Sequence, residues 1–236
     1  MARLTALSVA AALAVAAIPA AAQESQTDIN MVVALDRSES ISEPEAVAQI
    51  EGLIYALTDP RLIDAILSGW HGRIGIAVIT WSSFERSDLI LPWTVIADAD
   101  QASAVALALH RHLVTGGTPL DGTQTDLALG LRRAISQLEA APYVATREII
   151  NMVSDGIDNF GNVPIVARNA ALDRGVTINA LTMGRGRAIP VLRRYYERNV
   201  IGGPRAFVHN TPANQDFAAA MLRKMVIEVA LLNGSP

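Results

Sequence analysis

The sequence predicts an α/β fold: a doubly wound, mostly parallel sheet with one antiparallel edge strand and helices on both faces. First, the runs 31–35 (MVVAL) and 73–81 (RIGIAVITW) are apolar and rich in β-branched residues, as in strands buried on both faces. Second, strand-like runs alternate with segments whose apolar residues recur every three or four positions. Third, the short run Leu89–Trp93 contains Pro92, which favours a sheet edge, and its closeness to the preceding strand indicates an antiparallel hairpin.

The other elements follow in order. Ser42 can cap a helix, with Glu45 reaching back to it and Pro44 in the first turn. Asp59-Pro60 ends that helix, and a short helical piece follows at Leu62–Leu67. The remaining predicted helices are 102–113, 163–173, 189–198 and 215–231. One more is predicted directly after residues 123–126 and extends to residue 138. The remaining predicted strands are 147–153, 176–182 and 206–209. No repeat or linker divides the chain, so we expect one domain.

The first 22 residues have the pattern of a secretory signal peptide. Arg3 is followed by the apolar stretch Leu4–Ile18 and by the small residues 20–22, a typical cleavage site. The apolar stretch is shorter than a membrane-spanning helix requires. We therefore expect export to the periplasm or secretion, a folded domain over residues 23–236, and no membrane span after removal of the signal.

Charge and cysteine content exclude several functional classes. The chain has 19 basic and 23 acidic residues, a formal net charge of −4, which argues against a nucleic-acid partner. It contains no cysteine, so disulfides, thiolate zinc sites and cysteine nucleophiles are excluded. Lys224 is the only lysine, and the other basic residues are arginines. The sequence alone gives no functional conclusion from this bias.

Oxygen-bearing side chains gather where predicted strands end. Asp36, Ser38 and Ser40 alternate directly after the first strand, Thr123 follows a glycine-rich loop, and Asp155 follows a later strand. The carboxyl ends of parallel strands open onto one crevice, and hard cations such as Mg²⁺ prefer carboxylate and hydroxyl oxygens. The alternative is that these residues are ordinary strand ends, with helix caps and polar turns.

These segments together resemble the von Willebrand factor A domain. The resemblance rests on Asp36-x-Ser38-x-Ser40, Gly122-Thr123-x-Thr125-x-x-Ala128-Leu129 and Val153-Ser154-Asp155-Gly156, which cover most of the chain after the signal peptide. It implies a Rossmann-like A-domain fold and a metal-ion-dependent adhesion site. In that site, Mg²⁺ or Mn²⁺ would lie on Asp36, Ser38, Ser40, Thr123 and Asp155, the last directly or through water. Thr118, after a Gly-Gly pair, is an alternative to Thr123.

Other motifs resemble a group of exported bacterial A-domain proteins catalogued as a domain of unknown function. They are Ala56-Leu57-x-Asp59-Pro60, His71-Gly72-Arg73-Ile74, Pro92-Trp93, Tyr195-Tyr196, Ile201-Gly202-Gly203-Pro204 and Ala206-Phe207-Val208. Members of that group often have a cysteine before the Ile-Gly-Gly segment. Asn199 and Val200 occupy that stretch here, so this chain lacks any disulfide role there.

The function that these features indicate is binding and not catalysis. The ion's open position would accept a carboxylate from a partner protein. A metal-dependent hydrolase or phosphoryl-transfer enzyme using the same crevice is the alternative. However, no histidine is placed convincingly there, no Gly-x-Ser-x-Gly elbow is present, and Asp36-Arg37-Ser38 lacks a second aspartate two residues on. A scaffold with a vestigial metal site is a third alternative.

Overall fold

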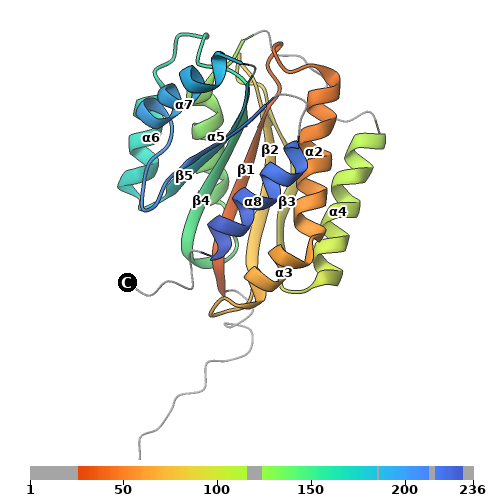
Figure 1. Cartoon of the computed structure of the whole chain (residues 1–236). Coiled ribbons are helices and arrows are strands. Elements are labelled where there is room, and N and C mark those ends of the chain that lie inside the picture. The colour runs from red at the N-terminus through yellow and green to blue at the C-terminus, as the bar shows by residue number, and fades with distance from the viewer. Residues whose placement is uncertain (1–25, 116–123, 185, 213–215, 231–236) are drawn as a thin grey trace, which may run out of the picture.

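The computed structural model describes residues 26–115, 124–184, 186–212 and 216–230, and within them one six-stranded sheet of order β3-β2-β1-β4-β5-β6 (Figure 1). The strands are β1 Gln26–Asp36, β2 Ile74–Trp81, β3 Ser87–Ile96, β4 Val144–Ser154, β5 Thr177–Gly184 and β6 Val208–Pro212. All neighbouring pairs are parallel except β2 and β3. The predicted fold class is confirmed.

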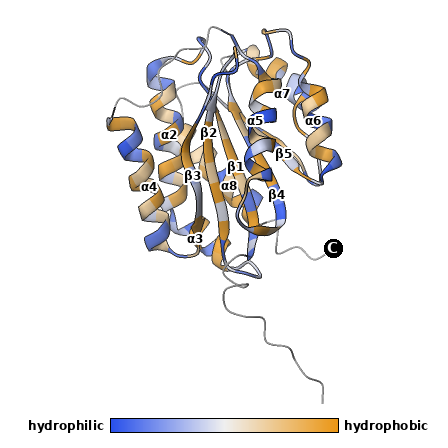
Figure 2. Cartoon of the chain, turned by 180° about the vertical axis from the view of Figure 1, so that it is seen from behind, coloured by the Kyte–Doolittle hydropathy of each residue, from blue (hydrophilic) through white to orange (hydrophobic). Residues whose placement is uncertain are grey.

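Helices cover both faces of the sheet (Figure 1). One layer consists of α2 Glu43–Thr58, α3 Pro60–Leu67, α4 Ala99–Val114 and α8 Phe217–Ala230. The other consists of α5 Leu127–Glu139, α6 Pro164–Asp173 and α7 Ala188–Asn199. Figure 2 shows hydrophobic strands between helices whose hydrophilic residues lie mainly on the outside.

Strand β1 is buried on both faces, as its continuous apolar run predicts. Met31, Val33 and Leu35 belong to the core beneath α2 and α8, whereas Val32 and Ala34 belong to the core beneath α5. Successive side chains of a strand point to opposite faces, so an uninterrupted apolar run fills both cores. This central strand therefore positions the loop that follows it.

The edge strand is longer than predicted. β3 continues from Ser87 to Ile96, past the predicted end points Leu89 and Trp93. Its register with β2 shifts near Pro92, because Thr94 pairs with Ile76 and Leu91 with Val78. This irregularity on the outermost strand accommodates a residue that cannot donate a backbone hydrogen bond.

Helix starts show where local sequence signals hold. The Glu45 carboxylate accepts hydrogen bonds from the Ser42 backbone N–H (3.0 Å) and hydroxyl (2.6 Å), as predicted. Asp59 caps α3, which therefore begins at Pro60 and not at Leu62. Helix α5 begins after residues 123–126, and Asp126 is its N-cap, accepting a hydrogen bond from the Leu129 N–H.

The only lysine of the chain is fully buried. The Lys224 ammonium on α8 donates to Glu228, one turn later, and to the Asn151 side chain of β4 (2.6 Å). Glu228 also accepts from the side chains of Asn151 (3.2 Å) and Asn179 on β5 (2.9 Å). This network, which we call the α8 polar cluster (Asn151, Asn179, Lys224 and Glu228), fixes the helix against two strands.

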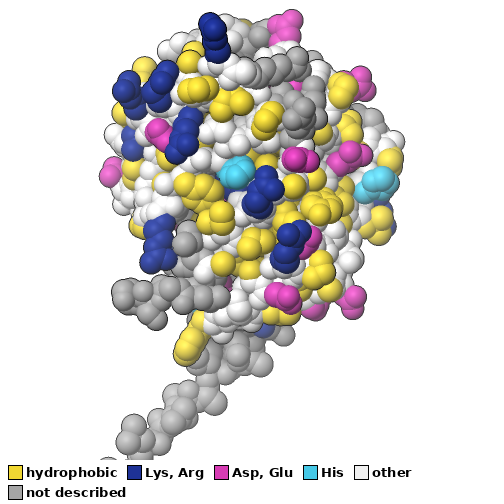
Figure 3. All heavy atoms as spheres, viewed as in Figure 1, with side chains coloured by type: hydrophobic (Ala, Val, Ile, Leu, Met, Phe, Trp, Pro, Cys, Tyr) yellow, Lys and Arg dark blue, Asp and Glu magenta, His cyan; other side chains and the backbone are white. Residues whose placement is uncertain are grey.

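Charged and apolar side chains are interspersed on the surface seen in Figure 3. Within the described residues, no helix is both long enough and apolar enough to cross a membrane. The predicted signal peptide, residues 1–22, lies outside the described residues.

Candidate metal centre

The candidate site lies at the carboxyl ends of β1 and β4, at the upper edge of the sheet in Figure 1. The chain continues from β1 to β2 on one side, whereas β4 and β5 lie on the other side. The strand order therefore reverses between β1 and β4, and ligands of doubly wound folds bind in the crevice at such a switch point. Asp36 is the last residue of β1, and Ser154 is the last residue of β4.

The loop after β1 directs alternate side chains toward this crevice. Asp36 is fully buried, and its Oδ1 accepts a hydrogen bond from the Ser38 N–H (2.7 Å). The Ser38 and Ser40 Oγ atoms are 3.1 Å apart. Arg37 points toward α2 instead, where its Nη2 donates to the Ala46 carbonyl (3.2 Å). The spacing Asp-x-Ser-x-Ser thus places three oxygen-bearing side chains together, while the intervening Arg37 points away from them.

Residues far apart in the chain meet here. The Ser40 hydroxyl donates to Asp155 Oδ1 at 2.6 Å, across 115 positions of sequence. Ser154 donates to Asp36 Oδ2, also at 2.6 Å. In an octahedral shell with metal–oxygen distances of about 2.1 Å, neighbouring ligand oxygens are about 3 Å apart. The contact between Ser38 and Ser40 (3.1 Å) has this spacing, and the contact between Ser40 and Asp155 (2.6 Å) is somewhat shorter.

The threonine of the predicted site, Thr123, lies outside the described residues, as does its alternative Thr118. The described residues begin again at Gln124, beside the site. The Thr125 N–H donates to Asn159 Oδ1 (2.7 Å), and the Asn159 N–H donates to the Thr125 carbonyl (3.1 Å). Asn159 therefore joins the segment after Thr123 to the loop that carries Asp155.

A tyrosine supports the Asp155 loop from below. Tyr196 of α7 is fully buried, and its hydroxyl donates to the Gly156 carbonyl (3.0 Å). Burial raises the pKa of Tyr196 well above its ordinary value, so the hydroxyl keeps its proton. Sequence reasoning assigned this residue no role at the site. The Tyr195-Tyr196 pair was the only sequence feature that drew attention to Tyr196, and it contributed only to the family resemblance.

The electrostatics of the site favour a cation. Burial raises the pKa of Asp36 to about 6, hydrogen bonds from Ser154 and Ser38 oppose that rise, and the nearby Asp155 charge adds to it. Ionising a buried carboxylate next to a second carboxylate is unfavourable in the absence of a compensating positive charge. A divalent cation would supply that charge.

The donor set fits a hard ion. Its side chains offer carboxylate and hydroxyl oxygens, with no sulfur or imidazole among them. In the described parts of the chain, this edge included, no three His, Asp or Glu side chains come together as a metal site. A cation at this edge would thus depend on the hydroxyls as well as on the two acids.

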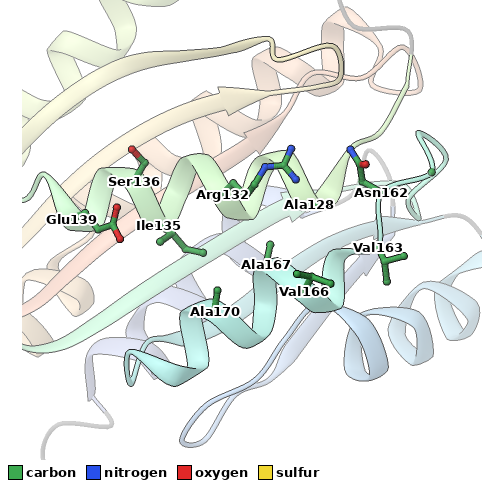
Figure 4. Close-up of a pocket in the computed structure, with 11 residues that line it drawn as sticks. Ala128, Arg132, Ile135, Ser136, Glu139, Asn162, Val163, Val166, Ala167 and Ala170 are labelled. Atoms are coloured by element: carbon green, nitrogen blue, oxygen red, sulfur yellow. The ribbon is translucent and has the colours of Figure 1, made fainter.

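A pocket of about 400 Å³ opens directly beside the oxygens. Ser40, Thr125 and Asp155 contribute to its lining, together with apolar residues of the 155–159 loop and of α7. A larger hollow, of about 640 Å³, lies between α5 and α6 (Figure 4). None of the four predicted metal ligands that the structure describes, Asp36, Ser38, Ser40 and Asp155, lines that larger hollow, so we treat it as separate from the site.

Residues 26–233 match the protein family described as "Protein of unknown function (DUF1194)". The chain belongs to this family. The match runs from β1 through α8 and includes both strand ends that form the crevice. A search of curated protein sequences found no match.

Solved structures of low sequence identity share the fold. The von Willebrand factor domain of the type V pili tip protein Mfa5 from Porphyromonas gingivalis aligns with a TM-score of 0.56 and 13% identity, over 89% of this chain and 98% of that one. The pilus adhesin SpaC from Lactobacillus rhamnosus GG aligns with a TM-score of 0.60 and 16% identity, over 87% of this chain and 30% of that one.

A third similar structure is proximal thread matrix protein 1 from the mussel byssus, solved with a zinc-occupied MIDAS motif. It aligns with a TM-score of 0.60 and 17% identity, over 87% of this chain and 48% of that one. The chain thus spans less than half the length of SpaC and of the mussel protein. These similarities show that the chain has a von Willebrand factor A-like fold.

Proposed function

We propose that this domain is an exported, adhesion-type binding module that holds Mg²⁺ or Mn²⁺ on Asp36, Ser38, Ser40, Thr123 and Asp155. In this proposal, a partner protein contributes a carboxylate to the ion. The observation that carries it is the 2.6 Å contact between Ser40 Oγ and Asp155 Oδ1, at the switch point of the sheet. One similar structure, the mussel byssus protein, has a zinc-occupied MIDAS motif on this fold, which supports the choice of a divalent cation.

A bound divalent ion would supply an open coordination position for an incoming carboxylate. The residues of this chain set the strength of that interaction. Only Asp36 and Asp155 bring negative charge, while Ser38, Ser40 and Thr123 are neutral. The ligand set therefore only balances the charge of the ion, which keeps its attraction for a third carboxylate.

The side chains around the candidate metal ligands favour a binding function over an enzymatic one. Among the described residues, no histidine, lysine or arginine lines the pocket beside them. A hydrolase or phosphoryl-transfer enzyme would use such groups for proton transfer or for charge stabilisation in the transition state. The mainly apolar lining instead suits a surface that makes contact with another protein.

Export is part of the proposal. Its support is the charged and apolar N-terminal sequence with small residues at positions 20–22, together with the pilus proteins among the similar structures. We place the domain in the periplasm or outside the cell, where a protein partner would meet it.

Thermal unfolding in chelator and then in excess Mg²⁺ or Mn²⁺ tests the ion. A free-ion concentration of about ten times Kd stabilises the folded state by about 1.4 kcal/mol. For a domain of this size, that corresponds to a rise in Tm of about 3–6 °C. Asp155→Asn should remove most of the rise. Asp173→Asn, which changes an exposed aspartate at the end of α6, is the matched control and should retain it.

Affinity capture from an exported protein fraction then tests the partner. A partner retained with Mg²⁺, lost on chelation and not retained by Asp155→Asn would support the proposal. An unchanged Tm in both cations, or a full rise in Asp155→Asn, would remove the metal site. Metal-dependent hydrolysis of phosphoesters or peptides that Asp155→Asn abolishes would favour an enzyme instead.

A further inference from the structure

We propose that the partner's carboxylate is accompanied by a bulky aliphatic side chain, which enters the pocket beside the metal centre. This inference rests on the proposed function and specifies the chemistry of the partner. We call the pocket the apolar subsite and define its wall by Ile157, Ala188, Val191 and Leu192.

The first argument is position. Ser40 and Asp155, two of the proposed metal ligands, also line the apolar subsite. A carboxylate that approaches the ion between them has its neighbouring atoms at the mouth of this pocket. The subsite is therefore continuous with the place where the partner's acid would bind.

The second argument is the exposure of apolar side chains at this place. Ile157 is 43% exposed, and Val191 is 50% exposed. They come from different elements, the loop after β4 and the first turns of α7, and they border the same hollow. Isolated exposed apolar residues are common, but two that face one cavity at the edge of a polar site form a surface that gains free energy when covered.

The third argument is that the subsite is built on a supported framework. Leu192 is almost fully buried and forms the base of the pocket. One turn further along α7, Tyr196 holds the Gly156 carbonyl next to Ile157. The wall from α7 and the wall from the Asp155 loop are thereby joined, and a preformed pocket binds its occupant with little cost in ordering.

The lining also selects the occupant. A pocket of about 400 Å³ with apolar walls has room for a branched aliphatic side chain. None of the described residues that line it is cationic, so its described lining does not favour a second acid. The acid group would instead reach the ion. An acidic residue next to a leucine-like side chain fits both halves of this surface.

Two small acids probe the idea without knowledge of the partner. Acetate supplies only the carboxylate, whereas 4-methylpentanoate adds a leucine-like isobutyl group on a short chain. Their Kd values would be measured by protein-detected NMR titration in excess Mg²⁺ and in chelator. We expect 4-methylpentanoate to bind at least about tenfold more tightly than acetate in Mg²⁺, from the apolar area it buries. Both should lose binding in chelator.

Val191→Ser should reduce this tenfold preference to less than about threefold. The control Val166→Ser alters a valine of α6 that is 72% exposed in the separate hollow between α5 and α6, and it should keep the preference. Chemical shift changes should include the backbone signals of Ile157 and Val191. This readout reports where the acid lies as well as how tightly it binds.

The outcomes separate this inference from the proposed function. Equal metal-dependent binding of both acids would overturn the apolar subsite and leave the metal centre standing. A preference for 4-methylpentanoate that persists in chelator would also overturn it, because the pocket would then act without the ion. Absence of metal-dependent binding by either acid, with no effect of Mg²⁺ on Tm, would overturn the proposed function itself.

Discussion

Replacing Lys224 with methionine removes the ammonium group that contacts Glu228 in the interior beneath α8. Methionine has a similar length and no charge, so the change tests the charge and not the packing volume. Both side chains of the pair are fully buried. In the variant, Glu228 keeps the amide donors of Asn151 and Asn179, at 3.2 and 2.9 Å. Asn151 Oδ1 loses the donor that now lies 2.6 Å away.

The expected cost follows from this geometry. Removing one partner of a buried ion pair costs about 3–5 kcal/mol, because the other charge stays buried without compensation. Because Glu228 keeps two hydrogen bonds in Lys224→Met, we expect the loss of stability to lie near the lower end of this range, at about 3 kcal/mol. With a urea m value of about 2–3 kcal/mol/M, the midpoint of urea unfolding should fall by about 1 M or more. The assay is equilibrium urea unfolding at constant pH, followed by fluorescence and by circular dichroism.

The double variant decides whether the charge is the reason. Lys224→Met with Glu228→Gln removes both charges and retains an amide oxygen as acceptor for the two asparagines. We expect the double variant to be more stable than Lys224→Met alone, with a coupling energy of about 2 kcal/mol. A loss below about 1 kcal/mol in Lys224→Met, or single losses that simply add in the double variant, would refute the reasoning.

Two further predictions concern the candidate metal centre. Burial raises the pKa of Asp36 from 3.8 to about 6, so between these values the folded state holds a proton that the unfolded state has released, and stability falls as pH rises. In chelator, the free energy of unfolding of wild type should fall by about 2 kcal/mol more than that of Asp36→Asn between about pH 4.5 and 7. Urea unfolding at a series of pH values measures this, and profiles that run parallel for the two proteins would contradict it. Tyr196→Phe removes the 3.0 Å hydrogen bond to Gly156 and should cost about 1 kcal/mol and reduce the Mg²⁺-induced rise in Tm. Tyr55→Phe, an exposed tyrosine of α2, is the control, and an equal Mg²⁺ response in both would count against a supporting role for Tyr196.

The sequence predicted the sheet well because its strongest signals are local. Residues 31–35 and 74–81 are all buried within strands covered on both faces, so only apolar or small side chains fit at most of these positions. Pro92 correctly indicated an edge strand but made that strand look too short. The prediction missed that a shift in register can carry a strand past a proline.

The site was predictable to the level of loops but not of contacts. Parallel strands place their carboxyl ends together, which is enough to expect Asp36 and Asp155 at one edge. The contact between Ser40 and Asp155 depends on the register of β1 and β4, in which Leu35 pairs with Val153. Register is a property of the folded sheet, and no motif in one segment encodes it.

Residues that act at a distance in the chain were missed for a related reason. Tyr196 lies 40 positions from the Gly156 carbonyl that it holds, and the sequence shows only an aromatic pair on a helix. In the sequence, Lys224 stood out only as the single lysine of the chain, and lysine is rarely fully buried unless it has a partner. Its partners on β4 and α8 become visible only once the helix is placed against the sheet.

Strand β4 links the two parts of the molecule that these variants perturb, and their effects should nevertheless separate. Asn151 connects β4 to the α8 polar cluster, whereas Ser154, at the end of the same strand, holds Asp36. The pairing of β1 with β4 continues between these points and is independent of the Lys224 charge. Lys224→Met should therefore lower global stability and leave the Mg²⁺-induced rise in Tm nearly unchanged. Tyr196→Phe acts on the loop itself, so it should do the opposite: a small loss of stability with a clear loss of the response to the ion.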